Sequence, residues 1–331
     1  MTEFRTLPWT ETPEGAPRRV GVELEMAGVE APDIAQAVID ELGGRFDAES
    51  AFSGTVRDTE LGDFTVELDV EILASRRYLD ALRQIGIELE GGPIRDNLER
   101  LLSQVTGLVV PHELVCPPVP LAALPRIDAI RARLHEAGAR GTEASALYAF
   151  GLQFNIEIHS TGADHLLAIL RAFLLRYPAI LERHEIDLSR KLTPYVQSFP
   201  EDFVAHVLNP DYAPDLEGLI DDYLDYTPTR NRPLDALPLF AWLDADRVAA
   251  APVEHALVKP RPAWHYRLPD CRIDEPDWSL AEPWAAWAEV EALAHRRREL
   301  RRAARKRYGE SSALRRWASA AWRTLTRRSG R

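Results

Sequence analysis

Five segments of the chain alternate apolar and polar side chains with a period of two, which is the pattern of a β-strand with one buried face. The segments cover residues 19–26, 64–73, 108–118, 150–159 and 262–269. An antiparallel sheet can bury one face under helices and leave the other face open. The pattern therefore predicts an α+β fold, in which an antiparallel sheet has helices on its apolar face and an open, concave polar face.

The polar positions of these segments carry many carboxylates. In the first segment, Glu23 and Glu25 would lie on one face, roughly 6–7 Å apart. Such a pair is destabilising unless water, a basic group or a cation lies between the two charges. The other polar positions are Glu67, Asp69, Glu71, Glu113, Gln153, Asn155, Glu157, His159, His265 and Arg267. For the first segment alone, a strand with solvated glutamates is an equally good interpretation.

The residue types on this face indicate a class of chemistry. Oxygen ligands with an occasional imidazole suit Mg²⁺ or Mn²⁺, which commonly bridge carboxylates and phosphate oxygens. An arginine in the same array suits a phosphate that is transferred. The pattern therefore favours nucleotide-dependent phosphoryl transfer or ligase chemistry.

Five short motifs follow one another along the strand segments. They are Gly-Val-Glu-Leu-Glu at 21–25, Glu-Leu-Asp at 67–69, His-Glu-Leu-Val-Cys-Pro-Pro at 112–118, Gly-Leu-Gln-Phe-Asn at 151–155 and His-Tyr-Arg-Leu-Pro at 265–269. In this order they resemble the carboxylate–amine ligases of the glutamine synthetase and glutamate–cysteine ligase fold, and most closely the amidoligase family. The resemblance implies a glutamine synthetase-like catalytic domain that binds ATP and two or three divalent cations. ATP would phosphorylate a carboxylate, and an amine would then attack the acyl phosphate to give an amide.

The resemblance also implies roles for individual residues. Glu23 and Glu25 would bind two different metal ions, and Asp69 and Glu113 would complete one metal site or orient its water. Arg267 would neutralise the phosphate during transfer. The predicted metal ligands are Glu23, Glu25, Asp69, Glu113, Gln153 and His265, the predicted catalytic residues are Arg267, Glu113 and Asp69, and the predicted nucleotide contacts are Arg267, Arg230, Lys259 and Asn155. A structural helix cap is the alternative role for Arg230, and Lys259 has a similar alternative.

Two of these positions depart from the family pattern. Gln153 stands where the family usually has a histidine, and His265 stands where relatives often have a glutamate. A metal site that Gln153 and His265 share with Glu25 would lose one negative charge, which weakens the binding of a hard cation. A degenerate ligase that binds nucleotide or regulates is therefore the alternative function.

The remaining apolar periodicity predicts helices. Spacings of three and four residues predict helices on the apolar face of the sheet over 32–42, 94–105, 121–137 and 164–184. Shorter helices are expected at 201–209 and 215–226, in an acidic stretch punctuated by prolines. We expect residues 1–17 to form an N-terminal extension, residues 18–295 the catalytic domain and residues 296–331 a basic amphipathic tail.

Charge is unevenly distributed between these parts. Residues 296–331 carry 14 Lys and Arg against 2 Asp and Glu, whereas the whole chain carries 40 against 52. The acidic body argues against nucleic acid as its main ligand. The tail would suit an anionic membrane or another polyanion, so an adaptor that binds through its tail is a further alternative function. The tail would otherwise dock on the acidic body or be partly disordered.

Location and substrates are less constrained. No signal-peptide or membrane-spanning run occurs in the sequence, and two cysteines, Cys116 and Cys271, are too few for a disulfide framework, so we expect a cytoplasmic protein. The expected substrates are a small-molecule or peptide carboxylate and an amine. The sequence predicts neither their identity nor an oligomeric state.

Overall fold

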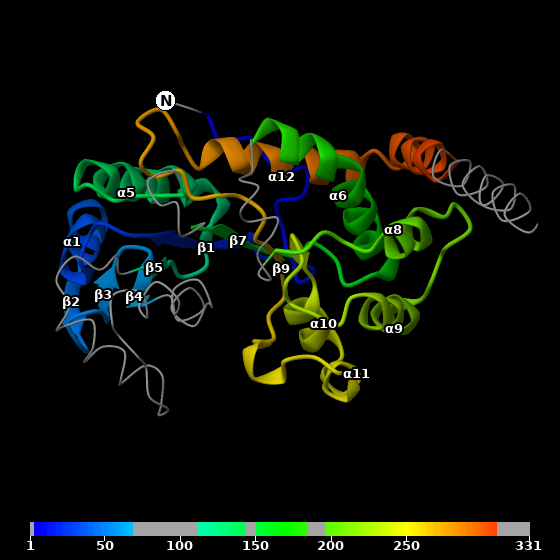
Figure 1. Ribbon diagram of the computed structural model, residues 1–331, viewed down its shortest axis with the longest axis horizontal. Coiled ribbons are helices and arrows are strands. Elements are labelled where there is room, and N and C mark those ends of the chain that lie inside the picture. Colours follow the sequence, from blue (N-terminus) through cyan, green and yellow to red (C-terminus); the bar gives the residue numbers. More distant parts are fainter. Residues whose placement is uncertain (1–2, 69–110, 143–149, 185–195, 310–331) are drawn as a thin grey trace, which may run out of the picture.

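An antiparallel sheet forms the centre of the computed structural model, which describes residues 3–68, 111–142, 150–184 and 196–309 (Figure 1). Within these residues the sheet has nine strands in the order β2-β3-β4-β5-β1-β7-β9-β8, with β6 paired to β1. The strands are β1 (Arg19–Met26), β2 (Arg45–Ala48), β3 (Gly54–Thr59), β4 (Gly62–Leu68), β5 (His112–Val115), β6 (Val119–Pro120), β7 (Leu152–Glu157), β8 (Leu234–Asp235) and β9 (Ala263–Tyr266). The mixed fold of helices and an antiparallel sheet is therefore as predicted.

Each of the five alternating segments contains one of these strands. In β1, Val22 and Leu24 are fully buried, while Glu23 and Glu25 are half-buried on the other face. β3 and β4 pair as a hairpin. β1 has the bounds of its segment, β5, β7 and β9 are shorter than theirs, and β4 begins two residues before its segment. The part of the second segment from Asp69 onward lies outside the described residues. β2, β6 and β8 have four residues or fewer, too few to produce a detectable period.

Helices pack on both sides of this sheet. They are α1 (Ala31–Leu42), α5 (Leu124–Glu136), α6 (Ala163–Arg183), α8 (Glu201–Leu208), α9 (Leu216–Tyr226), α10 (Leu237–Leu243), α11 (Ala245–Ala250) and α12 (Ala281–His295), with 3₁₀ turns η1 (Leu121–Ala123) and η2 (His255–Leu257). Figure 1 shows α5, α12 and α6 along one side of the sheet and α10 and α11 on the other. None of the described helices combines the length and the apolarity that a membrane span requires.

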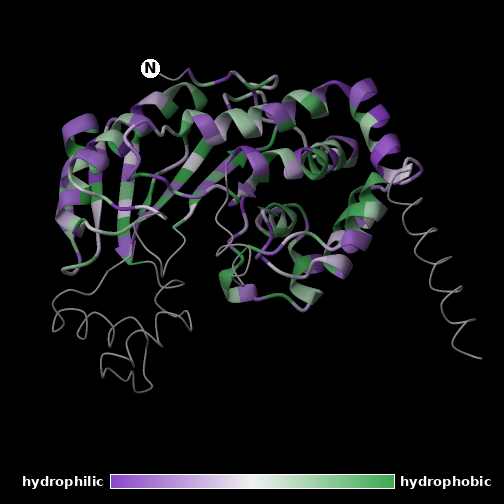
Figure 2. Cartoon of the chain, turned by 45° about the horizontal axis from the view of Figure 1, so that its top comes forward, coloured by the Kyte–Doolittle hydropathy of each residue, from purple (hydrophilic) through white to green (hydrophobic). Residues whose placement is uncertain are grey.

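Five of the six predicted helices coincide with α1, α5, α6, α8 and α9, and the sixth, at 94–105, lies outside the described residues. The sequence did not predict α12, because its apolar residues lie on nearly every side of the helix. Trp284 and Trp287 are both buried there, and Ala286 and Val290 are inaccessible to solvent. In Figure 2, apolar colour follows the inner helices, and the outer helical turns are hydrophilic.

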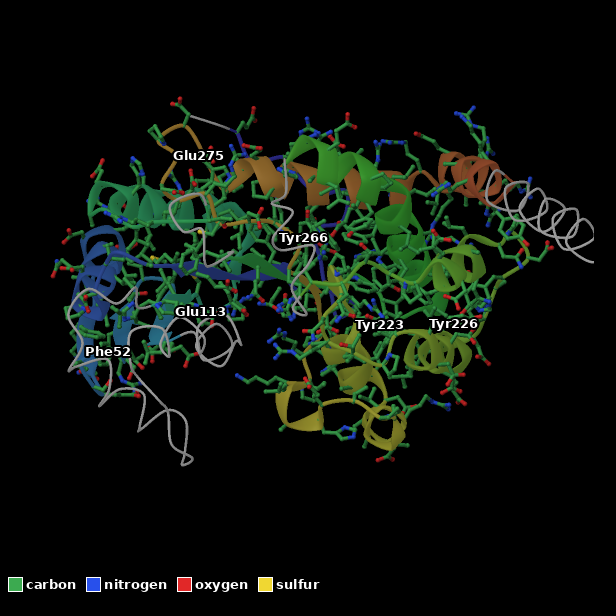
Figure 3. The ribbon with its side chains drawn as sticks, viewed as in Figure 1. Phe52, Glu113, Tyr223, Tyr226, Tyr266 and Glu275 are labelled. Carbon is green, nitrogen blue, oxygen red and sulfur yellow. The ribbon has the colours of Figure 1, made fainter. Side chains whose placement is uncertain are left out.

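The polar face of the sheet is only partly open, which corrects the expectation of an uncovered face. α10 packs against β9, and its Pro238 reaches the cavity on the polar side of the sheet. Figure 3 shows Glu113 of β5 on the side of the sheet away from α5. The helices at the β9 end therefore form a wall beside the polar face.

A buried ion pair joins the start of β1 to α12. Arg18 donates to both carboxylate oxygens of Glu291 at 3.0 and 2.7 Å, and the two side chains are 2% and 1% exposed. Arg18 also donates to the carbonyl oxygens of Trp9 and Glu157, and Trp287 donates to Glu291. The pair thereby ties the N-terminal segment, the edge of β7 and α12 together.

Arg18→Ala should lower the free energy of unfolding by about 3–5 kcal/mol, because it leaves the Glu291 carboxylate buried without its partner. Arg19→Ala, at the neighbouring exposed position, should change it by less than about 0.5 kcal/mol. Urea unfolding followed by circular dichroism measures both. Equal effects of the two substitutions would contradict a stabilising role for the buried pair.

Candidate active site

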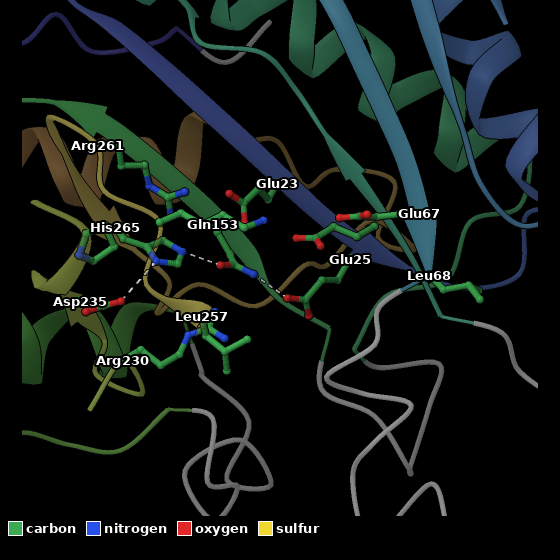
Figure 4. Close-up of a pocket in the computed structure, with 13 residues that line it drawn as sticks. Glu23, Glu25, Glu67, Leu68, Gln153, Arg230, Asp235, Leu257, Arg261 and His265 are labelled. Atoms are coloured by element: carbon green, nitrogen blue, oxygen red, sulfur yellow. Dashed lines mark hydrogen bonds and ion pairs between the residues drawn. The ribbon is translucent and has the colours of Figure 1, made fainter. Parts of the chain in front are cut away.

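A cavity of about 240 Å³ lies on the polar face of the sheet and brings acidic and basic residues together (Figure 4). Glutamates from three neighbouring strands line one side, and cationic residues from two loops line the other. Nine of the ten predicted site residues line this cavity or contact a residue that does; Asn155 and Arg267 are the two that only contact lining residues. The lining members are Glu23, Glu25, Glu113, Gln153, Arg230, Lys259 and His265.

Sheet register brings the carboxylates face to face. Glu25 of β1 lies directly opposite Glu113 of β5, and Glu113 lies opposite Glu67 of β4. Like charges at opposed positions are destabilising in a sheet. Four carboxylates on adjacent strands form an oxygen donor set of the kind that hard divalent cations prefer.

The metal prediction therefore has suitable donor chemistry at this place. Within the described ranges, however, no three His, Cys, Asp or Glu side chains are close enough to form a ready-made metal site. Asp69, which the sequence also predicted as a metal ligand, lies outside those ranges. Glu67 lines the cavity, although the sequence gave it no role beyond a place on the polar face. Glu67 lies two residues before Asp69, so the alternation with a period of two placed both residues on the same face and could have identified Glu67.

A chain of hydrogen bonds crosses the floor of the cavity from β9 to β1. Gln153 Nε2 donates to Glu25 Oε1 at 2.7 Å, which leaves Gln153 Oε1 to accept from His265 Nε2 at 2.6 Å. Gln153 is 7% exposed and His265 is 3% exposed. The three residues predicted to share a metal ion thus lie together, and in this arrangement both ends of the Gln153 amide contact other protein groups.

Backbone and amide groups near β7 orient the two glutamates of β1. Asn155 Nδ2 donates to Glu23 Oε1 at 2.6 Å, and the backbone N–H of Gly151 donates to Glu25 Oε2. A Cβ atom at Gly151 would lie 2.9 Å from Glu25 Oε1, so a side chain there would displace the carboxylate. Asn155 is not among the lining residues, so the structure places this predicted nucleotide contact behind Glu23.

The opposite side of the cavity is cationic. Arg230 follows α9, and Lys259 and Arg261 precede β9. Arg267 does not line the cavity: it is 4% exposed, and its Nη1 donates to the carbonyl oxygen of Arg230 at 3.4 Å. Arg267, which the resemblance assigns to the phosphate, is therefore one residue away from the lining, and Arg261 is a lining cation that the sequence did not assign to the site.

Asp235 is a buried acid that the sequence did not single out. It lies on β8, is 1% exposed, and has Oδ2 3.6 Å from His265 Nδ1. Burial raises the pKa of Asp235 to about 6, against the effects of a hydrogen bond from Leu237 and of nearby arginines. Burial also lowers the pKa of His265 well below its usual range, and Arg261 and other arginines lower it further. A two-residue strand offers no period that could reveal such a residue.

The raised pKa of Asp235 has a consequence for stability. An acid whose pKa rises from 3.8 to about 6 on folding stabilises the fold below pH 3.8, and that contribution is lost as the pH rises through 6. Asp235→Asn should therefore be more stable than the wild type at pH 7, by up to about 3 kcal/mol, and equally stable near pH 4. Urea unfolding at both pH values measures the difference.

The exposed acid Asp211 provides the control for this comparison. Asp211→Asn should change the free energy of unfolding by less than about 0.5 kcal/mol at either pH. A constant difference between Asp235→Asn and the wild type from pH 4 to 7 would contradict the burial of an ionisable acid.

One protein family matches the chain. The model of the family described as "Putative amidoligase enzyme" matches residues 16–289, which include every described residue that lines the cavity. No curated protein and no solved structure matches the chain significantly. The match covers most of the chain and includes all five motifs between residues 21 and 269. The chain therefore belongs to the putative amidoligase family, whose description is that of a ligase.

Proposed function

We propose that the protein is an ATP-dependent carboxylate–amine ligase that works through an acyl phosphate with Mg²⁺ or Mn²⁺. One observation carries the proposal: in a chain of the amidoligase family, four glutamates and three cationic side chains face one another across a single cavity. The antiparallel sheet with its polar face supports a glutamine synthetase-like domain. The substrates would be a small-molecule or peptide acid and an amine.

Charge explains why metal ions belong to this proposal. A triphosphate is strongly negative, and beside Glu23, Glu25, Glu67 and Glu113 it would be repelled. These glutamates, with Asp69, would hold the divalent cations. When bound, such cations offset this repulsion and neutralise charge on the phosphate oxygens. Gln153 and His265 would support Glu25 as hydrogen-bonded neighbours, which second-layer groups commonly do for metal ligands.

The cationic wall would hold the phosphates from the other side. Arg230 and Arg261 can each present a planar fork of N–H donors to phosphate oxygens, and Lys259 adds a point charge. Arg267, which donates to the carbonyl of Arg230, would position that loop. In this arrangement the γ-phosphate lies between the two walls of the cavity.

The reaction then proceeds in two steps. An oxygen of the substrate carboxylate attacks the γ-phosphorus, the bond from that phosphorus to the β–γ bridging oxygen breaks, and ADP leaves. The amine nitrogen next attacks the carbonyl carbon of the acyl phosphate, and inorganic phosphate departs with the bonding electron pair. A glutamate of the cavity, such as Glu113, accepts the proton that the amine loses.

Glu23→Gln and Glu25→Gln should each weaken Mg²⁺-dependent ATP binding at least about tenfold and reduce turnover at least about a hundredfold. Isothermal titration with a non-hydrolysable ATP analogue measures binding without a substrate. Phosphate release with panels of acids and amines measures turnover. Glu49→Gln removes an exposed glutamate away from the cavity and should change neither quantity. An absence of Mg²⁺-dependent ATP binding in the wild type would contradict the proposal.

A second function is favoured by one observation. Both ends of the Gln153 amide are engaged by His265 and Glu25, and Gln153 replaces the usual histidine of the family pattern. A degenerate ligase that binds nucleotide without turnover would fit this arrangement. Tight binding of ATP with Mg²⁺, and no phosphate release with any acid–amine pair, would distinguish it from the active ligase.

The cellular location is also a proposal. Both cysteines, Cys116 and Cys271, are buried as free thiols, which supports the proposed cytoplasmic location. The expected contact of residues 296–331 with an anionic membrane or polyanion remains a proposal, because residues 310–331 lie outside the described ranges.

A further inference from the structure

A second cavity, of about 350 Å³, is lined by residues between Asp164 and Arg305 and differs from the first cavity in charge. It is formed by α6, the segment 210–213 and the helical segment 297–309 that follows α12. In Figure 1 that helical segment is the red ribbon to the right of α6. Four arginines and a single carboxylate, that of Asp164, line this cavity.

The spacing of the arginines directs them to one side of the helical segment. Arg297, Arg301 and Arg305 are four residues apart, so they lie above one another on one helix face. Leu300 and Ala304, both 3% exposed, pack beside them toward α6. The helix is therefore anchored by its apolar residues, and the guanidinium groups line the mouth of the cavity.

The fourth arginine, Arg171 of α6, is held by neutral groups. It donates to the carbonyl oxygens of Val207, Asn209 and Tyr212 at 2.7–2.9 Å. These contacts fix the guanidinium group without cancelling its charge by a carboxylate. Burial lowers the pKa of Arg171, and the nearby positive charges of Arg301 and Arg297 lower it further.

The arginines of the helical segment form few contacts with carboxylates in the described part of the chain. Arg297 donates to the backbone carbonyl of Asp164 at 2.9 Å. Burial lowers the pKa of Arg297, and the charge of Arg301 acts in the same direction, while Asp164 opposes it. Within the described part of the chain, Arg301 and Arg305 form no ion pair. The lining thus carries four positive charges against one negative charge.

We propose that this cavity binds the phosphate group of a small phosphorylated ligand, at a site separate from the acidic cavity. Guanidinium groups match phosphate oxygens with paired N–H donors. The apolar side chains of Leu167 and Leu300 would contact the less polar part of the ligand. A volume of about 350 Å³ suits a small molecule, because ligand cavities commonly measure roughly 300–1,000 Å³.

Inorganic pyrophosphate and inorganic phosphate, titrated into the full-length chain with EDTA present, test this proposal. Without divalent cations the glutamates of the acidic cavity repel phosphate, so binding reports on the arginine cavity. We expect pyrophosphate to bind in a salt-dependent manner. Arg301→Gln/Arg305→Gln should weaken that binding at least about tenfold, because two charge-assisted contacts are lost.

A matched control removes the same charge from the same helical segment. Arg298→Gln/Arg302→Gln changes two exposed arginines that do not line the cavity, and it should leave pyrophosphate binding within about twofold. Arg301→Lys/Arg305→Lys keeps the charge but loses the fork, and should give an intermediate affinity. Unfolding in urea verifies that each variant remains folded.

Three outcomes would overturn the proposal. The first is no binding of either anion to the wild type. The second is equal weakening by the two glutamine double variants, which would indicate diffuse attraction to a basic helix. The third is binding to vesicles of anionic lipid with none to pyrophosphate, which would indicate a membrane surface. Because the assay contains no divalent cation and no ATP, failure of the ligase proposal leaves its result unaffected.

Discussion

Repulsion between opposed carboxylates is the constraint on which the candidate active site depends. Register sets Glu25 against Glu113 and Glu113 against Glu67, although like charges at such positions weaken a sheet. A slip of one residue in β1 would turn its glutamates into the core and its Val22 and Leu24 toward water. Burial of the apolar face therefore fixes the register, and the register concentrates the acids. Burial of the apolar face must therefore offset the loss of stability that the clustered negative charges cause.

Strand β7 and the residue before it orient the two glutamates of β1. Asn155 binds Glu23, and Gln153 and the backbone of Gly151 bind Glu25, so each carboxylate of β1 has a donor from the same neighbouring stretch. Neutral donors orient a carboxylate without cancelling its charge, which keeps it available to a cation. An arginine in place of Gln153 would satisfy Glu25 fully and remove that capacity. Gln153 thus orients Glu25 through a neutral amide donor.

The sequence predicted the elements whose pattern is periodic and missed those whose position depends on tertiary packing. Alternation in residues 19–26 and 150–159 identified the polar face, and the order of motifs identified the family. α12 gave no period because apolar residues lie on nearly every side of it, and Asp235 lies on a strand too short to have one. The resemblance assigned Arg267 to the phosphate, but β9 ends at Tyr266, and the buried Arg267 side chain donates to the carbonyl oxygen of Arg230. Which of several loop cations reaches a cavity depends on how the loops fold over it, which periodicity does not report.

The two cavities make opposite demands on an anion. In the acidic cavity, a phosphate must approach four glutamates, so its affinity should depend on divalent cations and on the cationic wall opposite. In the arginine cavity, the charge excess is positive, so attraction is direct and is reduced by salt. The acidic body contains the cavity lined by glutamates, and the basic C-terminal end supplies three of the four arginines of the second cavity. Under the two proposals, one phosphorylated molecule would bind with divalent cations and another would bind without them, so a chelator would distinguish the two sites.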